Sequence, residues 1–536
     1  MSILSSNTFL EWVQNSFGTN QSWNDYWEDY YKTDPTLSRV RFCMDLVFGS
    51  SHRALLSTDK ITTTSSITGV KYAYLPYMES APTLSSEYQI GTGNASQRSF
   101  SMTVSGKSIG DPINLLDTNF MLAGFVEISL QFDGGDYDKR LVIMRGEMDS
   151  VNFGNKDEYI EFDVVEIDKT FSKIIPDVFI TKDKFEFCGD DVIGMRYPLV
   201  FDRHFAVPCI RLEDGEFGPK FMICQSHSFE VVTVYVDGLA YSDTNSSYPH
   251  SIEYLIDKQG VPYTAINFDF IQGNPEFSSG VSVYAEVRQI SGRYRGIIDV
   301  IEDILGTYSQ FGVESLDRVL FGKSKAKIGQ IELQTLINGS DTDNATRATQ
   351  FVEETICSQL PMVSTTYTYR GYGVVVTDLN AIPVGEYNSN LFPFIDRNTG
   401  LQEISKKELF SSFTIRYHYN PLTDTYERIL KMDSSNNEKC RRARFQIGEK
   451  EHDIIESVYI YNDETALAIL SWLADHKTNP CYYVEYTAYP ILYFRLDVGD
   501  NIIFSDEKLG LSRYTCTVTK KSLEGNTCII GMKIWT

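Results

Sequence analysis

The stretch from Asp463 to the C-terminus constrains the fold of this chain most. Apolar residues recur at helical spacing from Asp463 to Ala474, and an alternating segment from Tyr482 to Phe494 follows them. The turn sequence Leu496-Asp497-Val498-Gly499-Asp500 comes next, and two short predicted strands close at Trp535. A helix, a strand, a turn and then hairpins predict the end of an antiparallel β-barrel.

Short alternating runs also fill the region from about 60 to 290. They are rich in Val, Ile, Thr, Tyr and Phe, and Gly, Asp, Asn and Ser bound them. The predicted strands are Val70 to Tyr74, Phe100 to Val104, Gly124 to Phe132, Leu141 to Met144, Tyr159 to Ile167, Phe229 to Val236 and Val281 to Ile290. The clearest hairpin crosses the turn Asp133-Gly134-Gly135-Asp136. This spacing favours an antiparallel barrel or sandwich with insertions.

The pattern changes to helical spacing at Gly296. One amphipathic helix is predicted from Ile297 to Gly306, and a second from Asn344, as its N-cap, to Pro361. Strands at 365–369 and 373–377 complete a small α/β domain, and the stretch 380–408 is predicted as loops and a linker. Strands resume at Phe413.

A chain of 536 residues exceeds what one hydrophobic core normally serves. We therefore expect a mainly β, multi-domain fold with α+β parts. The predicted segments are an aromatic-rich N-terminal segment at 1–59, a first β-barrel with a loop-rich insertion at 60–295, an α/β domain and linker at 296–409, and a second β-barrel domain with a helix at 463–478, at 410–536.

The N-terminal segment concentrates aromatic side chains. The cluster comprises Trp12, Phe17, Trp23, Tyr26, Trp27, Tyr30 and Tyr31. It either packs on its own domain, which is the more common arrangement, or forms a docking arm, because Trp and Tyr are favoured at interfaces.

Charge and cysteine content exclude several classes of protein. The formal net charge of -24 disfavours nucleic-acid binding and anionic membranes. No apolar run approaches the length that spans a bilayer, and the start lacks the pattern of a secretory signal, so we expect no membrane anchoring and synthesis in the cytoplasm. The nine scattered cysteines do not form a disulfide framework, and buried free thiols are expected.

One constellation has the chemistry of a zinc site. Its residues are His204, Cys209, Cys224 and His227, of which Cys224 and His227 have the short spacing of half a site. The other half contains Pro208 and lies among apolar residues, so the prediction is that these are buried structural side chains and that no metal or other cofactor binds. Cys440, Cys481, Cys516 and Cys528 are too irregularly spaced to predict an iron–sulfur cluster.

Other motifs have structural explanations. Gly322-Lys323-Ser324 resembles the end of a phosphate-binding loop, but Asp317 stands where that loop needs its first glycine. The acidic run Asp133 to Asp138 lacks the downstream glutamate of a calcium loop and is needed as a turn. The basic run Lys439 to Arg444 is expected in a solvated loop or against an acidic partner. Paired carboxylates such as Asp190-Asp191 and Glu353-Glu354 do not by spacing alone predict catalysis.

With these residues in view, the chain resembles the hub proteins of bacteriophage tails, also called baseplate-hub or tail-tip proteins. Three stretches carry the resemblance: the hairpin from Phe125 to Glu147, the helix and strands from Asp463 to Phe494, and Val498-Gly499-Asp500-Asn501-Ile502-Ile503 with its hairpin to Ile530. Together they cover about half of the chain, in pattern rather than in motif.

The resemblance implies a structural virion protein rather than an enzyme. For the fold, it implies two tail-tube-like antiparallel β-barrels in each subunit, joined by small α/β domains. It also implies a homotrimer whose six barrels cap the tail tube, adapt sixfold to threefold symmetry and anchor the tip spike or fibres. Implied partners are other copies of the chain, the tail tube or distal tail protein, a spike or fibre protein, and phage DNA in passage; the implied place is the virion tail. The alternatives are a tail-associated enzyme that degrades glycan or peptidoglycan, and a receptor-binding adhesin.

Overall fold

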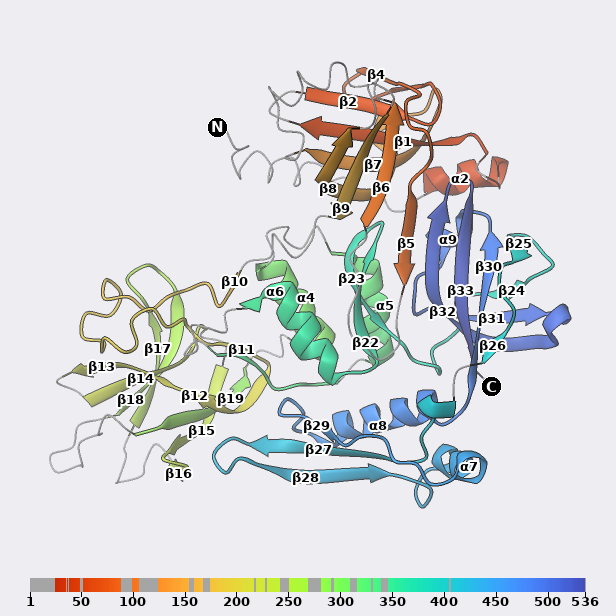
Figure 1. The fold of residues 1–536 in the computed structure, drawn as a ribbon. Helices are drawn as coiled ribbons and strands as arrows, with labels where there is room; N and C mark the ends of the chain where they lie inside the picture. The colour runs from red at the N-terminus through yellow and green to blue at the C-terminus, as the bar shows by residue number, and fades with distance from the viewer. Residues whose placement is uncertain are drawn as a thin grey trace.

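The computed structural model describes residues 25–34, 36, 38–48, 52–87, 99–105, 124–153, 159–166, 174–215, 218–226, 229–241, 250–268, 281–290, 294–308, 316–328, 331–338, 346–403 and 406–535. These residues form several β-sheets arranged around a central group of helices (Figure 1). The expected fold class, mainly β with α+β parts and several domains, is confirmed.

The first barrel is a six-stranded antiparallel sheet with the order β2-β1-β7-β8-β9-β6. Its strands are β1 (Val40–Phe48), β2 (His52–Ser57), β6 (Ser99–Ser105), β7 (Phe125–Phe132), β8 (Leu141–Phe153) and β9 (Tyr159–Glu166). Residues 75–79 connect the two edge strands: the amide of Leu75 donates to Leu55 O in β2 at 3.0 Å, and that of Glu79 donates to Thr103 O in β6 at 3.2 Å. The sheet is thereby curled into a barrel.

Two strands of this barrel precede the predicted start at residue 60. β1 pairs with β7 along eight residues, from Val40 to Val47, so the N-terminal region supplies a central strand of the sheet. The predicted hairpin between β7 and β8 is confirmed, with a single 3₁₀ turn, Tyr137–Lys139, between the strands. The small hairpin of β3 (Ile61–Thr64) and β4 (Lys71–Tyr74) packs beside that turn.

The second barrel is built from the C-terminal part of the chain. Its strands are β30 (Cys481–Ala488), β31 (Asn501–Asp506), β32 (Leu511–Glu524), β33 (Thr527–Trp535) and the short β24 (Glu386–Asn388), β25 (Phe394–Arg397) and β26 (Gln402–Glu403). The rings of Tyr486 in β30 and Phe504 in β31 lie 5.0 Å apart, although two strands separate them in the sheet. Phe394 contacts both rings, at 5.5 and 5.4 Å, so this sheet is also curled around its core.

Three sequence expectations for this barrel are corrected. The stretch 380–408, predicted as loops and a linker, contributes β24 to β26 to the sheet. The predicted strand from Tyr482 to Phe494 ends at Ala488, because Pro490 has no amide to continue the ladder and begins the helix α9 (Ile491–Arg495). The final strands are not short, since β32 has 14 residues and β33 has 9.

The two barrels share a strand order. In the first, β6 is followed along the chain by β7, β8 and β9, which lie in the order β7-β8-β9-β6; in the second, β30 is followed by β31, β32 and β33, in the order β31-β32-β33-β30. In each set the second strand of the meander is the longest, with 13 residues in β8 and 14 in β32, and carries a bulge against the next strand. The subunit therefore contains one β-topology twice.

Two elements join the barrels. The chain leaves the first barrel to form β5 (Thr83–Glu87), which pairs with residues 520–524 of β32, and then returns as β6. The helix α2 (Asp25–Thr33) lies between the barrels (Figure 1). One continuous hydrophobic core, with Val126, Met144 and Phe162 on one side and Val484, Ile502 and Val518 on the other, spans both barrels.

The described residues between 203 and 289, within the predicted loop-rich insertion, are rich in strands instead. They form two four-stranded antiparallel sheets, β12-β19-β15-β16 and β13-β14-β18-β17. The strands are β12 (Arg203–Pro208), β13 (Ile210–Gly215), β14 (Gly218–Cys224), β15 (Phe229–Val236), β16 (Leu239–Tyr241), β17 (His250–Ile256), β18 (Pro262–Phe268) and β19 (Val283–Gln289). Buried residues of both sheets, such as Val234 and Phe221, share a core, so the unit is a β-sandwich.

Helices and a hairpin occupy the centre of the molecule. They are α4 (Ile297–Tyr308), α5 (Arg318–Ile328), α6 (Ala348–Gln350) with the π-helical stretch Phe351–Cys357, β22 (Val363–Thr368) and β23 (Gly371–Val376). Two short pairs attach the sandwich and its preceding segment to this centre: β10 (Ile174–Ile175) with β21 (Thr346–Arg347), and β11 (Leu199–Phe201) with β20 (Thr335–Ile337). Asn344, the predicted N-cap, lies outside the described residues.

The remaining unit packs below the centre in Figure 1. It comprises β27 (Phe413–Asn420), β28 (Thr425–Met432), β29 (Ile455–Glu456), α7 (Glu438–Ile447) and α8 (Asp463–Lys477). The side chain of Asn462 caps α8 by accepting from the amide of Thr465 at 2.7 Å. Ile469, Leu470 and Leu473 of α8 join the core of the central helices, which confirms the predicted helix.

Candidate functional site

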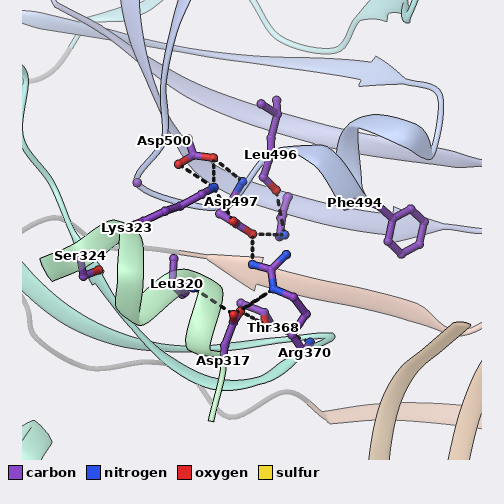
Figure 2. Close-up of polar contacts among 12 residues, drawn as sticks. Asp317, Leu320, Lys323, Ser324, Thr368, Arg370, Phe494, Leu496, Asp497 and Asp500 are labelled. Atoms are coloured by element: carbon purple, nitrogen blue, oxygen red, sulfur yellow. Dashed lines mark hydrogen bonds and ion pairs between the residues drawn. The ribbon is translucent and has the colours of Figure 1, made fainter. Parts of the chain in front are cut away.

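Six charged residues meet where the central domain contacts the second barrel. They are Asp317, Lys323, Arg370, Asp497, Asp500 and Lys521 (Figure 2). Three positive and three negative charges are gathered from distant parts of the sequence, and most of them are buried. We call this group the charge junction.

The central domain supplies three of the six. Asp317 precedes α5 and accepts from the amide of Leu320 at 3.0 Å, so its carboxylate caps the first turn of the helix. Lys323 lies one turn into α5. Arg370 lies in the tight turn between β22 and β23, where its Nε donates to both oxygens of Asp317 at 2.9 Å.

The second barrel supplies the other three. Asp497 and Asp500 lie in the turn between α9 and β31, and Lys521 lies in β32. The amide of Asp497 donates to Asp500 Oδ2 at 2.9 Å, which fixes the turn so that both carboxylates face α5. The Nζ of Lys521 donates to the carbonyls of Tyr493 and Leu496 at 3.1 and 2.9 Å, so it also closes the end of α9.

Asp497 is the centre of the network. Its Oδ1 accepts from Arg370 Nη2 at 2.8 Å and from Lys521 Nζ at 3.5 Å, and its Oδ2 accepts from Lys323 Nζ at 2.7 Å. Lys323 reaches Asp500 as well, at 2.9 Å. Arg370 therefore bridges Asp317 of the central domain to Asp497 of the barrel, and Lys323 ties α5 to the same turn.

The surroundings set the ionisation of these groups. Burial alone raises the pKa of Asp497, but Lys521, Arg370 and Lys323 outweigh it and hold the pKa of Asp497 below its ordinary value. Burial lowers the pKa of Lys521 to about 8 despite the neighbouring Asp497. For Lys323, burial opposes charging, but Asp497 and Asp500 raise its pKa overall. All three are therefore ionised at neutral pH.

Gly499 allows the closest backbone approach in the junction. It has a φ of +85°, and a Cβ at this position would lie 2.3 Å from Cγ1 of Val375 in β23. Lys327 of α5 donates to Gly499 O at 2.8 Å and to Val376 O at 2.9 Å from the other side. The turn of the barrel and the hairpin of the central domain are thus in direct contact.

The chemistry of the junction is that of a structural fastening. Its three positive and three negative charges balance, and each of the six side chains forms at least one ion pair with another member of the group. Such a closed set of ion pairs fixes orientation, because removing either partner of a buried pair leaves an uncompensated charge. It holds the second barrel against the central domain.

A second fastening joins the two barrels through α2. The buried Trp27 donates from Nε1 to Lys139 O at 3.0 Å, and Tyr30 stacks on Phe132 of β7 with ring centroids 4.6 Å apart. On the other side of the helix, Glu28 is ion-paired with Arg495 of α9. The described part of the N-terminal aromatic cluster therefore packs on its own subunit; Trp12, Phe17 and Trp23 lie outside the described residues.

A third group attaches the segment between α5 and β20 to the C-terminal unit. Tyr461 donates to Glu332, and Asn462 donates to the same carboxylate at 3.4 Å. Asp202 lies nearby with a φ of +61°, and burial together with the charge of Glu332 raises the pKa of Asp202 to about 6.

The structure brings two of the predicted metal candidates together, since Cys209 packs against the core that contains Cys224 and the two thiols interact electrostatically. His204 is in β12, where its Nδ1 accepts from the amide of Ala206 at 3.2 Å, and Cys224 is in β14 of the other sheet. Burial lowers the pKa of His204 to about 4 and raises that of Cys224 to about 12, which favours the uncharged imidazole and thiol. Cys209 follows β12, and His227 lies outside the described residues. Within the ranges described, no three His, Cys, Asp or Glu side chains are grouped to hold a metal ion.

The other motifs take structural places. Cys440, Cys481, Cys516 and Cys528 are buried free thiols in different elements. Lys323 and Ser324 lie inside α5 rather than in a loop, and the Oγ of Ser324 donates to Val374 O at 2.5 Å. The acidic run at 133–138 is a turn whose carboxylates receive hydrogen bonds from residues 62–67, for example Thr62 N to Asp133 at 2.8 Å. Glu353 is buried and accepts from Thr365 and Tyr372.

The basic run is corrected from a loop to a helix. Lys439, Arg441, Arg442 and Arg444 lie on α7, which Asn437 caps by accepting from the amides of Lys439 and Cys440. The sequence contained the signal, since Asn437 followed by Glu438 is a helix start.

Comparisons with known proteins give matches among solved structures alone. No family model and no curated protein matches the chain. Among solved structures, a tail protein from Neisseria meningitidis MC58 matches with a TM-score of 0.38 and 8% identity, over 92% of this chain and 98% of the other. The 43 kDa tail protein of prophage MuSo2 from Shewanella oneidensis matches with a TM-score of 0.39 and 11% identity, over 92% and 98%. Prophage tail protein gp18 from Listeria monocytogenes EGD-e matches with a TM-score of 0.38 and 8% identity, over 89% and 94%.

All three are described as tail proteins, and two of them come from prophages. At this level the likeness concerns the fold and transfers no residue role. Over the part of the chain that the structure describes, no helix is long and apolar enough to cross a membrane.

Proposed function

We propose that this chain is a structural protein of a bacteriophage tail, which forms a trimeric hub. In this proposal three copies cap the tail tube, adapt its sixfold symmetry to threefold symmetry and anchor the tip spike or fibres. Its partners are other copies of itself, the tail tube or distal tail protein, and a spike or fibre protein, with phage DNA in passage. Its place is the virion tail, after assembly in the host cytoplasm.

The repeated barrel topology supports this proposal most. Each subunit carries the order of four strands twice, as β7-β8-β9-β6 and β31-β32-β33-β30. Three subunits around one axis would present six such barrels, which matches a sixfold tube, while the sandwich and central domain would occur three times. A symmetry mismatch of this kind is met without any conformational change within the subunit.

The fastenings between the barrels support it further. A hub must hold its barrels at a fixed angle, because a ring of subunits closes only if the rotation from each subunit to the next is the same. The exchanged strand β5, the helix α2 and the shared core all oppose movement of one barrel against the other. The charge junction does the same for the central domain.

Native mass spectrometry of the purified chain, together with electron-microscopic class averages, tests the proposal. A trimer is expected, with six barrel densities around one end and three lobes at the other. A chain that stays monomeric at tens of micromolar and does not bind to tail tubes would contradict the hub, as would open filaments.

A further inference from the structure

The exposed face of α7 is the surface that the proposed function leaves unexplained. The helix carries four basic residues and one acidic residue, in a chain whose formal net charge is -24. The side chains of Arg441, Arg442 and Arg444 are all more than half exposed, and Phe445 beside them is 86% exposed. Arginine and aromatic residues together are the composition of interface hot spots.

Few counter-charges lie on the exposed face of the helix or just after its end. Glu438 accepts from both Arg441 and Arg442, and Arg444 pairs with Glu449 at 3.7 Å. These are exposed pairs, which contribute little and are readily exchanged for pairs with another molecule. The face therefore keeps positive charge beside a large apolar ring.

A surface of opposite character lies on the segment between β10 and β11. Here Phe187 is 68% exposed, and the side chains of Asp183, Glu186, Asp190 and Asp191 around it are exposed as well. Of the two lysines in this segment, Lys184 is buried against Asp257 and Lys182 pairs with Asp190. We call residues 183–191 the acidic knob.

The acidic knob and α7 lie on opposite sides of the subunit. In Figure 1 the segment that follows β10 is at the left, α7 is at the lower right, and the central helices lie between them. They do not meet within one copy, so a contact between them joins two copies. Such a contact pairs two different surfaces, and its repetition closes a ring when the rotation between neighbouring copies divides a full turn.

We propose that the Arg441–Phe445 face of α7 docks on the acidic knob of a second copy of the chain. Arginines of α7 would pair with carboxylates at 186 and 191, and Phe445 and Phe187 would bury each other from water. The inference rests on the proposed function, since it assigns a contact within the assembly. DNA is the less favoured occupant, because the negative charge of the whole chain opposes phosphate at long range.

Charge reversal tests this contact. The variants are R441E/R442E, E186K/D191K and the combination of all four changes, with R288E/R513E as a matched control that alters the net charge equally at exposed arginines elsewhere. Assembly is measured by native mass spectrometry across a dilution series. Each single-surface variant is expected to raise the midpoint of assembly at least tenfold, and the combination is expected to restore it. The control is expected to assemble like wild type.

A covalent test is independent of charge. In an F187C/F445C variant, mild oxidation is expected to give disulfide-linked oligomers on non-reducing gels, while F187C alone and F445C alone stay uncrosslinked like the wild type, whose nine cysteines are free thiols. If R441E/R442E assembles into trimers as the wild type does, or if the combination of all four changes does not restore assembly, the docking is overturned and the hub proposal is unaffected. A monomeric wild type would overturn both. Loss of DNA retention on R441E/R442E with assembly intact would assign the face to DNA instead.

Discussion

Replacing Asp497 by Asn removes the central negative charge of the charge junction without changing its shape. The wild-type carboxylate accepts from Arg370 at 2.8 Å and from Lys323 at 2.7 Å, and it is 2% exposed. In D497N, the amide can still accept with its oxygen, but its NH₂ group faces a cation. At least one buried positive charge therefore loses its compensation.

The expected cost is large because water cannot replace the lost partner. Breaking a buried ion pair by removing one charge costs about 3–5 kcal/mol, whereas an exposed pair is worth about 0–1 kcal/mol. At about 1.4 kcal/mol for each tenfold, the equilibrium for opening the junction rises about a hundred- to several-thousand-fold. Native-state hydrogen exchange, read by mass spectrometry on peptides covering 369–376 and 496–506, measures this opening locally.

E386Q is the matched control. Glu386 accepts from Arg513 at 2.6 Å in the same barrel, but both side chains are more than half exposed. Its change in exchange is expected to stay within about 1 kcal/mol of wild type. If the junction peptides exchange as slowly in D497N as they do in E386Q, the charge junction does not hold the two units together and the reasoning is refuted.

Two further predictions concern neighbouring contacts. G499A is expected to destabilise the junction by about 2–4 kcal/mol, because Gly499 has a left-handed φ and a Cβ there would clash with Val375. The control G510A also changes a glycine at positive φ, but the space around it is open, so it is expected to cost about 1 kcal/mol. Equal losses of stability in denaturant titrations of the two variants would contradict the clash. D202N is expected to stabilise the protein at pH 7.5 but not at pH 4, because the folded-state pKa of about 6 lies above the unfolded value, so a penalty appears as pH rises through 4 to 6 and is full above 6. Because the side chain is partly exposed, the expected gain in the free energy of unfolding is about 1–2 kcal/mol. Thermal melts at both pH values measure this gain, and a gain of equal size at pH 4 and pH 7.5 would disprove the assignment.

The sequence predicted those elements whose pattern is local. The residues of β7 and β8 alternate on either side of a turn rich in Asp and Gly, and α8 has an Asn cap and apolar residues at helical spacing. The spacing of apolar residues and the residues that end each element were therefore sufficient to predict these elements. α9 was missed because Ile491, Leu492, Tyr493 and Phe494 are all buried, which removes any difference between faces. The edge strands β24 to β26 were missed because each has four residues or fewer.

The charge junction was beyond local pattern. Lys323 and Asp497 are separated by 174 positions, and Arg370 and Asp497 by 127. Asp317, Lys323 and the Asp497–Asp500 turn each attracted notice, but for a phosphate loop and a barrel turn rather than for one another. Only the packing of α5 on the turn before β31 brings their charges together, and spacing along a chain contains no information about that packing.

The use of charge rather than apolar side chains at this contact has a consequence for assembly. Buried ion pairs add less net stability than an apolar core of equal volume, since loss of hydration offsets their attraction. They do impose direction: Arg370 reaches Asp317 and Asp497 together only when hairpin and turn are correctly placed. An apolar contact between the same units would tolerate sliding. In a closed ring, the rotation from each subunit to the next must be constant, because an error of a few degrees accumulates with each copy. A contact that fixes the relative orientation of the two domains therefore favours closure of the ring, whereas a contact that is stable but permits sliding does not.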